Sequence, residues 1–192
     1  MSHYYTSDQD LHNPFKIQGR IGRSVLSLWS DKGIFAKNSI DSATKTLLES
    51  TPICGNRILD LGCGSGVVGA YVGKDDEISV IGVDTNKRAV ILANKNYALH
   101  DVDGTAYVSD GYEAVTGTFS HIITNPPMAA GRSVCERFIR QAPEYLEKNG
   151  CFTLVARHKK GGKYLWKVMK DVFETVKVLE KSGGFRVYNA IH

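Results

Sequence analysis

The feature that most constrains the fold of this chain is a glycine-rich turn, 62–66, between an apolar segment and a helical one. The segment Ile58-Leu59-Asp60-Leu61 has the composition of a short buried strand, and a helix is predicted over 67–72. Glycines at such a turn let the backbone bend tightly and let a ligand approach without a side chain in between. A strand that enters a helix in this way indicates an α/β fold.

Strand-like and helix-like segments alternate along the rest of the chain. The expected strands are 79–84, 105–109, 119–124 and 151–156, and the expected helices are 86–99, one after Gly131 and one around 164–173. Two further strands, 175–180 and 185–191, flank Ser182-Gly183-Gly184, which is a hairpin signal. This order predicts a sheet that is parallel except for one reversed strand near its edge.

The first fifty residues are less regular. Phe15–Ile21 and Ser24–Trp29 are expected to form a β-ribbon, and Asp41–Glu49 a helix capped by Asp41. A chain of 192 residues suits one hydrophobic core better than two. We therefore expect an N-terminal extension, residues 1–50, packed on one main domain, residues 51–192.

The composition, 42% hydrophobic and 23% charged, is that of a globular protein. No apolar run approaches the roughly 20 residues that cross a bilayer, and the polar segment 1–10 does not have the pattern of a secretory signal. The four cysteines show no Cys-x-x-Cys pair and no cluster with histidine. Neither a disulfide nor a metal site is therefore expected, and a cytoplasmic location is predicted.

Two carboxylates end the first two strands of the alternating series. Asp60 precedes the glycines and Asp84 ends the next strand, and such strand ends line one crevice in an open α/β sheet. Asp84 can accept both hydroxyls of a ribose, as it would in a nicotinamide dehydrogenase. Asp60 favours S-adenosylmethionine (SAM) over a dinucleotide, because SAM carries an α-ammonium group and no pyrophosphate.

The next two strand ends also carry polar groups. Asp110, after Ser109, can accept a hydrogen bond from an adenine amine with Gly111 giving room, although Asp-Gly is also a common turn. Asn125-Pro126-Pro127-Met128 follows the fourth strand directly. The Asn125 amide oxygen and the Pro126 carbonyl can accept the N–H groups of a planar amine and hold its nitrogen toward a sulfonium methyl group.

These motifs together resemble the class I SAM-dependent methyltransferases that act on nitrogen. More closely, the chain is similar to the methyltransferase small domain family, which includes small-subunit rRNA guanine-N2 methyltransferases, and to its compact stand-alone archaeal members. The likeness runs from about Gly33 to Val187 and includes Gly33-Ile34-Phe35, Lys170–Phe173 and Gly183–Val187. Ala36 stands where family members often have serine.

The resemblance implies a Rossmann-like, doubly wound sheet of seven strands, the last antiparallel, with the catalytic domain at 51–192. It implies that the methionine part of SAM lies at Asp60, Gly62 and Gly64. The full cofactor site expected from it comprises Phe35, Asp60, Gly62, Cys63, Gly64, Asp84, Thr85, Ser109, Asp110, Gly111 and Asn125. The expected catalytic residues are Asn125, Pro126, Pro127 and Met128.

Met128 is a departure from the family pattern. Many Asn-Pro-Pro enzymes have an aromatic residue there, which stacks on the target base and is worth about 1–3 kcal/mol per base. Methionine offers a softer surface. A ring nitrogen such as guanine N7 already has an in-plane lone pair and needs less help from this motif, so N7 remains an alternative to the exocyclic N2.

Basic residues after the Asn-Pro-Pro motif suggest an RNA substrate. The expected phosphate contacts are Arg132, Arg157, Lys159, Lys160, Lys163 and Arg186. The expected function is methylation of a guanine nitrogen of tRNA or small-subunit rRNA, by a monomer or weak homodimer. The alternatives are guanine N7 of tRNA, a protein amide or small-molecule amine, and a non-catalytic module, which the presence of both Asp84 and Asn125 disfavours.

Overall fold

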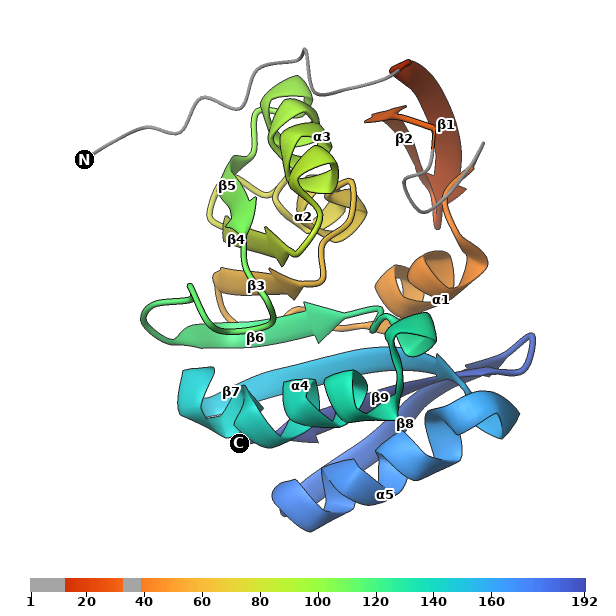
Figure 1. The fold of residues 1–192 in the computed structure, drawn as a ribbon, viewed down its shortest axis with the longest axis vertical. Coiled ribbons are helices and arrows are strands. Elements are labelled where there is room, and N and C mark those ends of the chain that lie inside the picture. The colour runs from red at the N-terminus through yellow and green to blue at the C-terminus, as the bar shows by residue number, and fades with distance from the viewer. Residues whose placement is uncertain (1–12, 33–38) are drawn as a thin grey trace.

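The computed structural model describes residues 13–32 and 39–192. Its centre is a seven-stranded sheet with the order β5-β4-β3-β6-β7-β9-β8 (Figure 1). The strands are β3 (Arg57–Leu61), β4 (Ser79–Asp84), β5 (Asp103–Val108), β6 (Phe119–Thr124), β7 (Leu146–Arg157), β8 (Thr175–Ser182) and β9 (Phe185–Ile191). Neighbours pair in parallel except at β9, which is antiparallel to both β7 and β8. The predicted sheet is confirmed.

Alternate residues of the central strands face two separate cores. Ile58 of β3 and Ile123 of β6 pack with α1 (Ser42–Ser50), α2 (Val67–Val72) and α3 (Lys87–Leu99). Leu59 and Ile122, one position away in each strand, pack with α4 (Arg132–Tyr145) and α5 (Lys163–Val172). Successive side chains of a strand point to opposite faces, so these continuous apolar strands require cover on both sides. In Figure 1, α4 and α5 accordingly lie in front of β7–β9.

The N-terminal segment contains the predicted ribbon and helix. Strands β1 (Phe15–Ile21) and β2 (Ser24–Ser30) pair antiparallel, and Asp41 caps α1 by accepting the N–H groups of Ala43 and Thr44. Asn96 of α3 holds the ribbon, since its amide accepts from the Trp29 N–H at 2.6 Å and donates to the Trp29 carbonyl at 2.9 Å. The division of the chain at residue 50 stays a prediction.

Three glycines make room for Tyr97 of α3. A Cβ atom added at Gly66, Gly69 or Gly82 would lie within 2.8, 2.5 or 2.6 Å of the Tyr97 ring or hydroxyl. Helix α3 can therefore pack closely against both α2 and β4. Glycines in these elements serve packing as well as backbone bending, and this packing fixes the helix that follows the glycine-rich turn.

The expectation that no disulfide forms is wrong. Cys54 and Cys151, 97 positions apart in the chain, are joined by a disulfide. His121 of β6 lies next to both, because its Nδ1 atom accepts from the Cys54 N–H at 3.2 Å and its backbone is in register with Cys151 of β7. The spacing along the chain gives no sign of this proximity, which the sheet order creates. Burial lowers the pKa of His121 to about 3, so this histidine is neutral.

Candidate active site

One large cavity of about 680 Å³ opens at the carboxyl ends of the central parallel strands. The structure brings most of the predicted site residues to its wall. Those that line it are Asp60, Gly62, Cys63, Gly64, Asp84, Thr85, Asp110, Gly111, Asn125, Pro126, Pro127, Met128, Arg157 and Lys160. Its volume is typical of a pocket that holds a small organic ligand.

The glycine-rich turn lies across the ends of β3 and β4. The N–H groups of Gly62 and Cys63 both donate to the Val83 carbonyl at 2.8 Å. Gly64 has a φ of +53°, and a Cβ atom added there would meet nothing within 4 Å. The backbone is therefore bare toward the cavity at Gly64, where a left-handed conformation favours glycine. This cradle fits a ligand that lies directly on the backbone.

Asp84 closes the turn from the end of β4. Its Oδ2 accepts from the Gly64 N–H at 2.9 Å, and its Oδ1 accepts from the Asn86 N–H at 2.8 Å. A carboxylate offers about four lone-pair sites, so one on each oxygen remains for a ligand. This arrangement can accept two neighbouring hydroxyl groups, as a ribose presents them.

Asp60 is the buried carboxyl of the site. It is only 2% exposed, and its Oδ2 accepts from the Gly69 N–H at 3.3 Å. Burial raises the pKa of Asp60 to about 7, and the nearby charge of Asp84 adds to the rise. A cationic group placed against Asp60 would favour its ionised form, so this position suits an ammonium ligand.

The turn after β5 is organised differently from the prediction. Asp110 lines the cavity but forms an ion pair with Arg137 of α4. Ser109 is absent from the cavity lining, because it is buried and its hydroxyl donates to the Gly111 carbonyl at 2.9 Å. Phe138 of α4 covers this corner, and a Cβ atom at Gly111 would lie 3.3 Å from its ring. Ser109 shapes the turn that presents Asp110.

The Asn-Pro-Pro segment leaves β6 in a tight turn. The Met128 N–H donates to the Pro126 carbonyl at 2.8 Å across Pro127, whose φ of −74° and ψ of 77° are those of an inverse γ-turn. A short 3-10 turn, Met128–Ala130, follows. The Asn125 amide nitrogen donates to Asp41 Oδ2 at 3.2 Å and to Thr44 Oγ1 at 3.0 Å.

Met128 packs toward the interior. Its sulfur lies 3.7 Å from the Cys135 Sγ atom, and a Cβ atom at Gly161 would come within 2.4 Å of its methyl group. The segment that follows the Asn-Pro-Pro turn is thus fixed against the loop after β7. Phe185 of β9 also lines the cavity and carries the Arg157 guanidinium over its ring at 4.5 Å.

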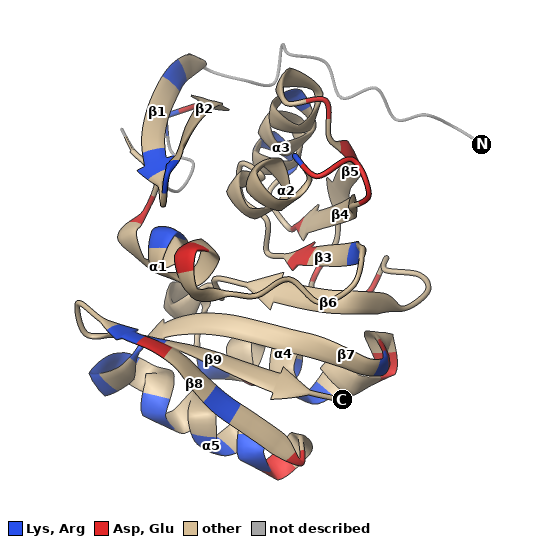
Figure 2. Ribbon diagram, turned by 180° about the vertical axis from the view of Figure 1, so that it is seen from behind, with Lys and Arg blue, Asp and Glu red and all other residues tan. Residues whose placement is uncertain are grey.

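The predicted basic residues divide into two groups. Arg157, Lys159, Lys160 and Arg186 line a second cavity of about 270 Å³, which shares Arg157 and Lys160 with the first. Arg132 and Lys163 are exposed and line neither cavity. The basic group lies at the end of β7, in the turn 158–162 before α5 and at the start of β9, which pairs with β8. Figure 2 shows blue segments along α5 and β8, whereas red ones gather around β3, β4 and β5.

Other residues of the wall were not predicted from the sequence. Phe35 lies outside the described residues, so its predicted role has no structural counterpart here. Asp41 and Thr44 of α1, Phe138 of α4 and Phe185 of β9 line the cavity unpredicted. In the sequence, Asp41 is recognisable only as the cap of a helix, and Phe138 only as part of the apolar face of a helix. The position of Phe185 next to the Gly183-Gly184 turn was a signal that could have pointed to it.

Comparison with known proteins identifies the family. The model of the methyltransferase small domain matches residues 25–189. The chain belongs to this family. The predicted class, a SAM-dependent methyltransferase with this α/β fold, is thereby confirmed. The match begins inside β2 and therefore includes α1 as well as the sheet.

The similar proteins differ in length. YbxB of Bacillus subtilis is 30% identical over 98% of this chain and 97% of its own length. Ribosomal RNA small subunit methyltransferase C of Chromohalobacter salexigens is 34% identical over 90% of this chain but 53% of its own length. The chain thus spans about half of that methyltransferase.

A solved structure shares the fold. It is that of the Thermus thermophilus 16S rRNA N2 G1207 methyltransferase, RsmC, in complex with AdoMet and guanosine. It superposes with a TM-score of 0.78 at 23% identity and covers 93% of this chain and 50% of its own.

The described residues, 13–32 and 39–192, contain no group of three or more histidine, cysteine, aspartate or glutamate residues arranged to hold a metal ion. Nor does a helix in these ranges have the length and apolar character needed to cross a membrane.

The buried carboxyl of Asp60 should make the stability of the fold depend on pH. The pKa of Asp60 is about 7 in the fold, whereas that of an ordinary aspartate is 3.8. The protonated carboxyl therefore contributes folding stability that is fully present below about pH 3.8 and is lost as the pH rises through about 7. Asp60→Asn removes this loss. Between about pH 4 and about pH 8, the free energy of unfolding of the variant should rise relative to that of the wild type, by at most about 4 kcal/mol. Urea denaturation without ligand measures this gain, and a pH-independent difference would contradict the assignment.

Proposed function

We propose that this protein methylates a nitrogen of small-subunit ribosomal RNA, specifically the exocyclic N2 of a guanine, with SAM as the methyl donor. The observation that carries the proposal is the position of Asn125 and Pro126 on the wall of the cavity that also contains Asp60, the bare backbone of Gly64 and Asp84. The ends of β3, β4 and β6 thus combine a nucleoside site with acceptors for an amine.

The donor set of the cavity fits SAM. Asp84 would accept the ribose hydroxyls, Asp60 would meet the α-ammonium group, and Asp110 would accept the adenine amine with the oxygen that Arg137 leaves. Bound SAM would supply an electrophilic methyl group, whose transfer would form an N–C bond from the nitrogen lone pair, return the C–S electrons to sulfur and release an N–H proton to water.

The protein's own contribution is to position the target nitrogen. The Asn125 oxygen accepts an N–H of the guanine amine, and the Pro126 carbonyl keeps one lone pair beside its bond to the Met128 N–H. These acceptors stabilise positive charge as it develops on nitrogen. Phe185, which lines the cavity as Phe138 does, can compensate for the missing ring at Met128 by facing the base.

The RNA part of the proposal rests on the basic cavity. Arg157 and Lys160 belong to both cavities, so a base in the first places its backbone phosphate near the second. Within the described residues Arg157, Lys159, Lys160 and Arg186 have no carboxylate partner. The names of the relatives, small-subunit rRNA methyltransferases, support the same class of substrate.

Two substitutions separate the cofactor site from the transfer site. Asp84→Ala should weaken SAM binding by about tenfold or more, because it removes charge-assisted bonds to the ribose. Asn125→Ala should leave SAM affinity within about threefold and lower kcat by about 10²-fold or more. Calorimetry measures the first quantity, and transfer of labelled methyl groups to small ribosomal subunits measures the second. Undiminished binding in Asp84→Ala, or full turnover in Asn125→Ala, would refute the respective role.

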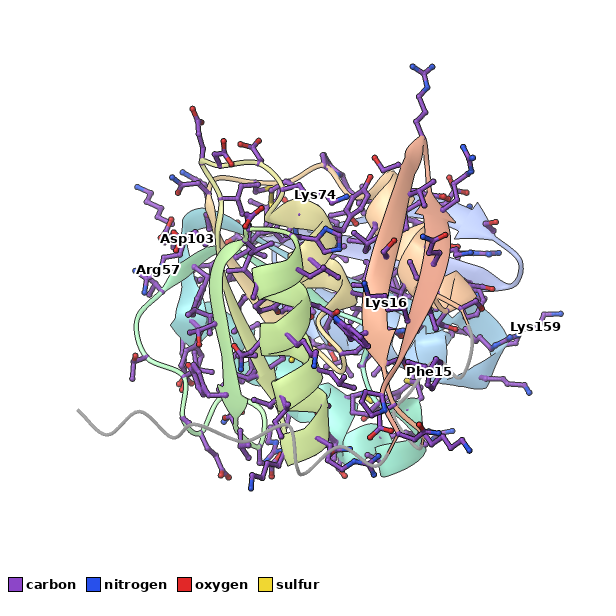
Figure 3. All side chains as sticks on the ribbon, turned by 90° about the horizontal axis from the view of Figure 1, so that it is seen from above. Phe15, Lys16, Arg57, Lys74, Asp103 and Lys159 are labelled. Carbon is purple, nitrogen blue, oxygen red and sulfur yellow. A yellow bond between two sulfur atoms is a disulfide. The ribbon has the colours of Figure 1, made fainter. Side chains whose placement is uncertain are left out.

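The basic cavity predicts a local salt effect. The binding constant K falls as the salt concentration rises, and each lost phosphate contact makes the slope of log K against log salt less steep by about 0.7–0.9. Lys159→Gln should show this change in binding to a small-subunit rRNA fragment. Lys74→Gln is the matched control, since Figure 3 shows Lys74 well apart from Lys159. Equal slopes for wild type and Lys159→Gln would exclude a phosphate contact there.

A further inference from the structure

The side-chain amide of Asn125 is held by the first turn of a helix that lies more than eighty positions earlier in the chain. Its nitrogen donates to Asp41 Oδ2 at 3.2 Å and to Thr44 Oγ1 at 3.0 Å. Both N–H bonds of the amide nitrogen are thereby used. The amide oxygen has no hydrogen-bond donor among the described residues.

These contacts determine which end of the amide faces the cavity. A carboxylate has no hydrogen to donate, so Asp41 can only accept, and the amide must present its nitrogen to it. A rotated amide would place two oxygens against each other. The orientation of the Asn125 oxygen is thus set by α1 and not by Asn125 alone.

The two partners are themselves fixed. The same Asp41 oxygen accepts from the Ala43 and Thr44 N–H groups at 3.0 and 3.1 Å, which is the N-cap of α1. Thr44 is only 7% exposed, and Leu47 and Leu48 anchor the helix in the core. Asp41 and Thr44 thus form a clamp on the Asn125 amide. This clamp lies on a rigid element, as precise positioning requires.

We propose that Asp41 and Thr44 are positioning residues for methyl transfer, which hold the Asn125 oxygen toward the target nitrogen and, through the charge of Asp41, strengthen it as an acceptor. Hydrogen bonds in a chain polarise one another, so a negative charge on the nitrogen side makes the amide oxygen more negative. This inference rests on the proposed role of Asn125.

The clamp also bears on the class of acceptor. An oxygen held in this orientation can bind only a nitrogen that carries hydrogen. The exocyclic amine of guanine has such hydrogens, whereas the ring N7 presents a lone pair that an amide oxygen would repel. The clamp therefore selects an amine over a ring nitrogen that carries no hydrogen, such as N7.

The substitutions at Asp41 separate geometry from charge. One oxygen, Oδ2, accepts all three N–H bonds, so Asp41→Asn can keep them with its amide oxygen and lose only the charge. Asp41→Ala loses both. We expect kcat to fall by about tenfold or more in Asp41→Ala and by less in Asp41→Asn, while SAM affinity by calorimetry stays within about twofold.

Substitutions at Thr44 provide a second, independent test. Thr44→Val keeps the shape but removes the acceptor, and should lower kcat; Thr44→Ser restores the hydroxyl and should rescue it. Thr46→Val is the matched control, since the Thr46 hydroxyl donates to the Ser42 carbonyl within α1 at 2.9 Å and contacts neither Asn125 nor its two partners. Its kcat, corrected for folded protein, should equal that of the wild type.

A spectroscopic readout is independent of turnover. The side-chain NH₂ signals of Asn125, identified by their loss in Asn125→Ala, should shift in Asp41→Ala and Thr44→Val but not in Thr46→Val. If Asp41→Ala and Thr44→Val keep the wild-type kcat while Asn125→Ala is inactive, the inference about the clamp is overturned but the proposed function is not. An equal loss of kcat in Thr44→Val and Thr46→Val would overturn it as well. Full activity of Asn125→Ala would instead refute the proposed function.

Discussion

The parallel pairing of β3 with β4 on one side and with β6 on the other is the constraint on which the rest of the site depends. It brings Asp60, Asp84 and Asn125 to one edge of the sheet, although they are separated by more than twenty positions each. The bonds from Gly62 and Cys63 to the Val83 carbonyl then hold the turn across two strand ends. A cavity results because this edge of the sheet is framed by helices from both faces.

The site has two halves with different demands. The half around Asp60 and Asp84 provides carboxylates in a bare backbone cradle, which suits the polar groups of a nucleoside that also carries an ammonium group. The half around Asn125 provides a fixed amide oxygen, and here charge does not pair with the ligand directly. Asp41 is hydrogen-bonded to the nitrogen end of the Asn125 amide and not to the ligand. Its negative charge therefore strengthens the amide oxygen as an acceptor without neutralising the amine.

Local signals predicted the sheet and most of the cavity, because strand ends and glycine turns are encoded within a few neighbouring residues. Contacts between distant segments were not predictable in this way. Asp41 and Thr44 met the local rule for a helix start, and nothing in the sequence links them to Asn125. Cys54 and Cys151 are likewise adjacent only through the sheet order. Ser109 and Asp110 were assigned the same role, yet only Asp110 lines the cavity.

The most direct test of the proposed activity is nucleoside mass spectrometry of small-subunit ribosomal RNA from cells with and without this protein. The clamped amide oxygen predicts that one N2-methylguanosine is lost in its absence and returns when the wild-type protein, but not Asn125→Ala, is supplied. Small-subunit RNA with an unchanged content of N2-methylguanosine would contradict the proposal, and a loss confined to N7-methylguanosine would contradict the role given to the amide.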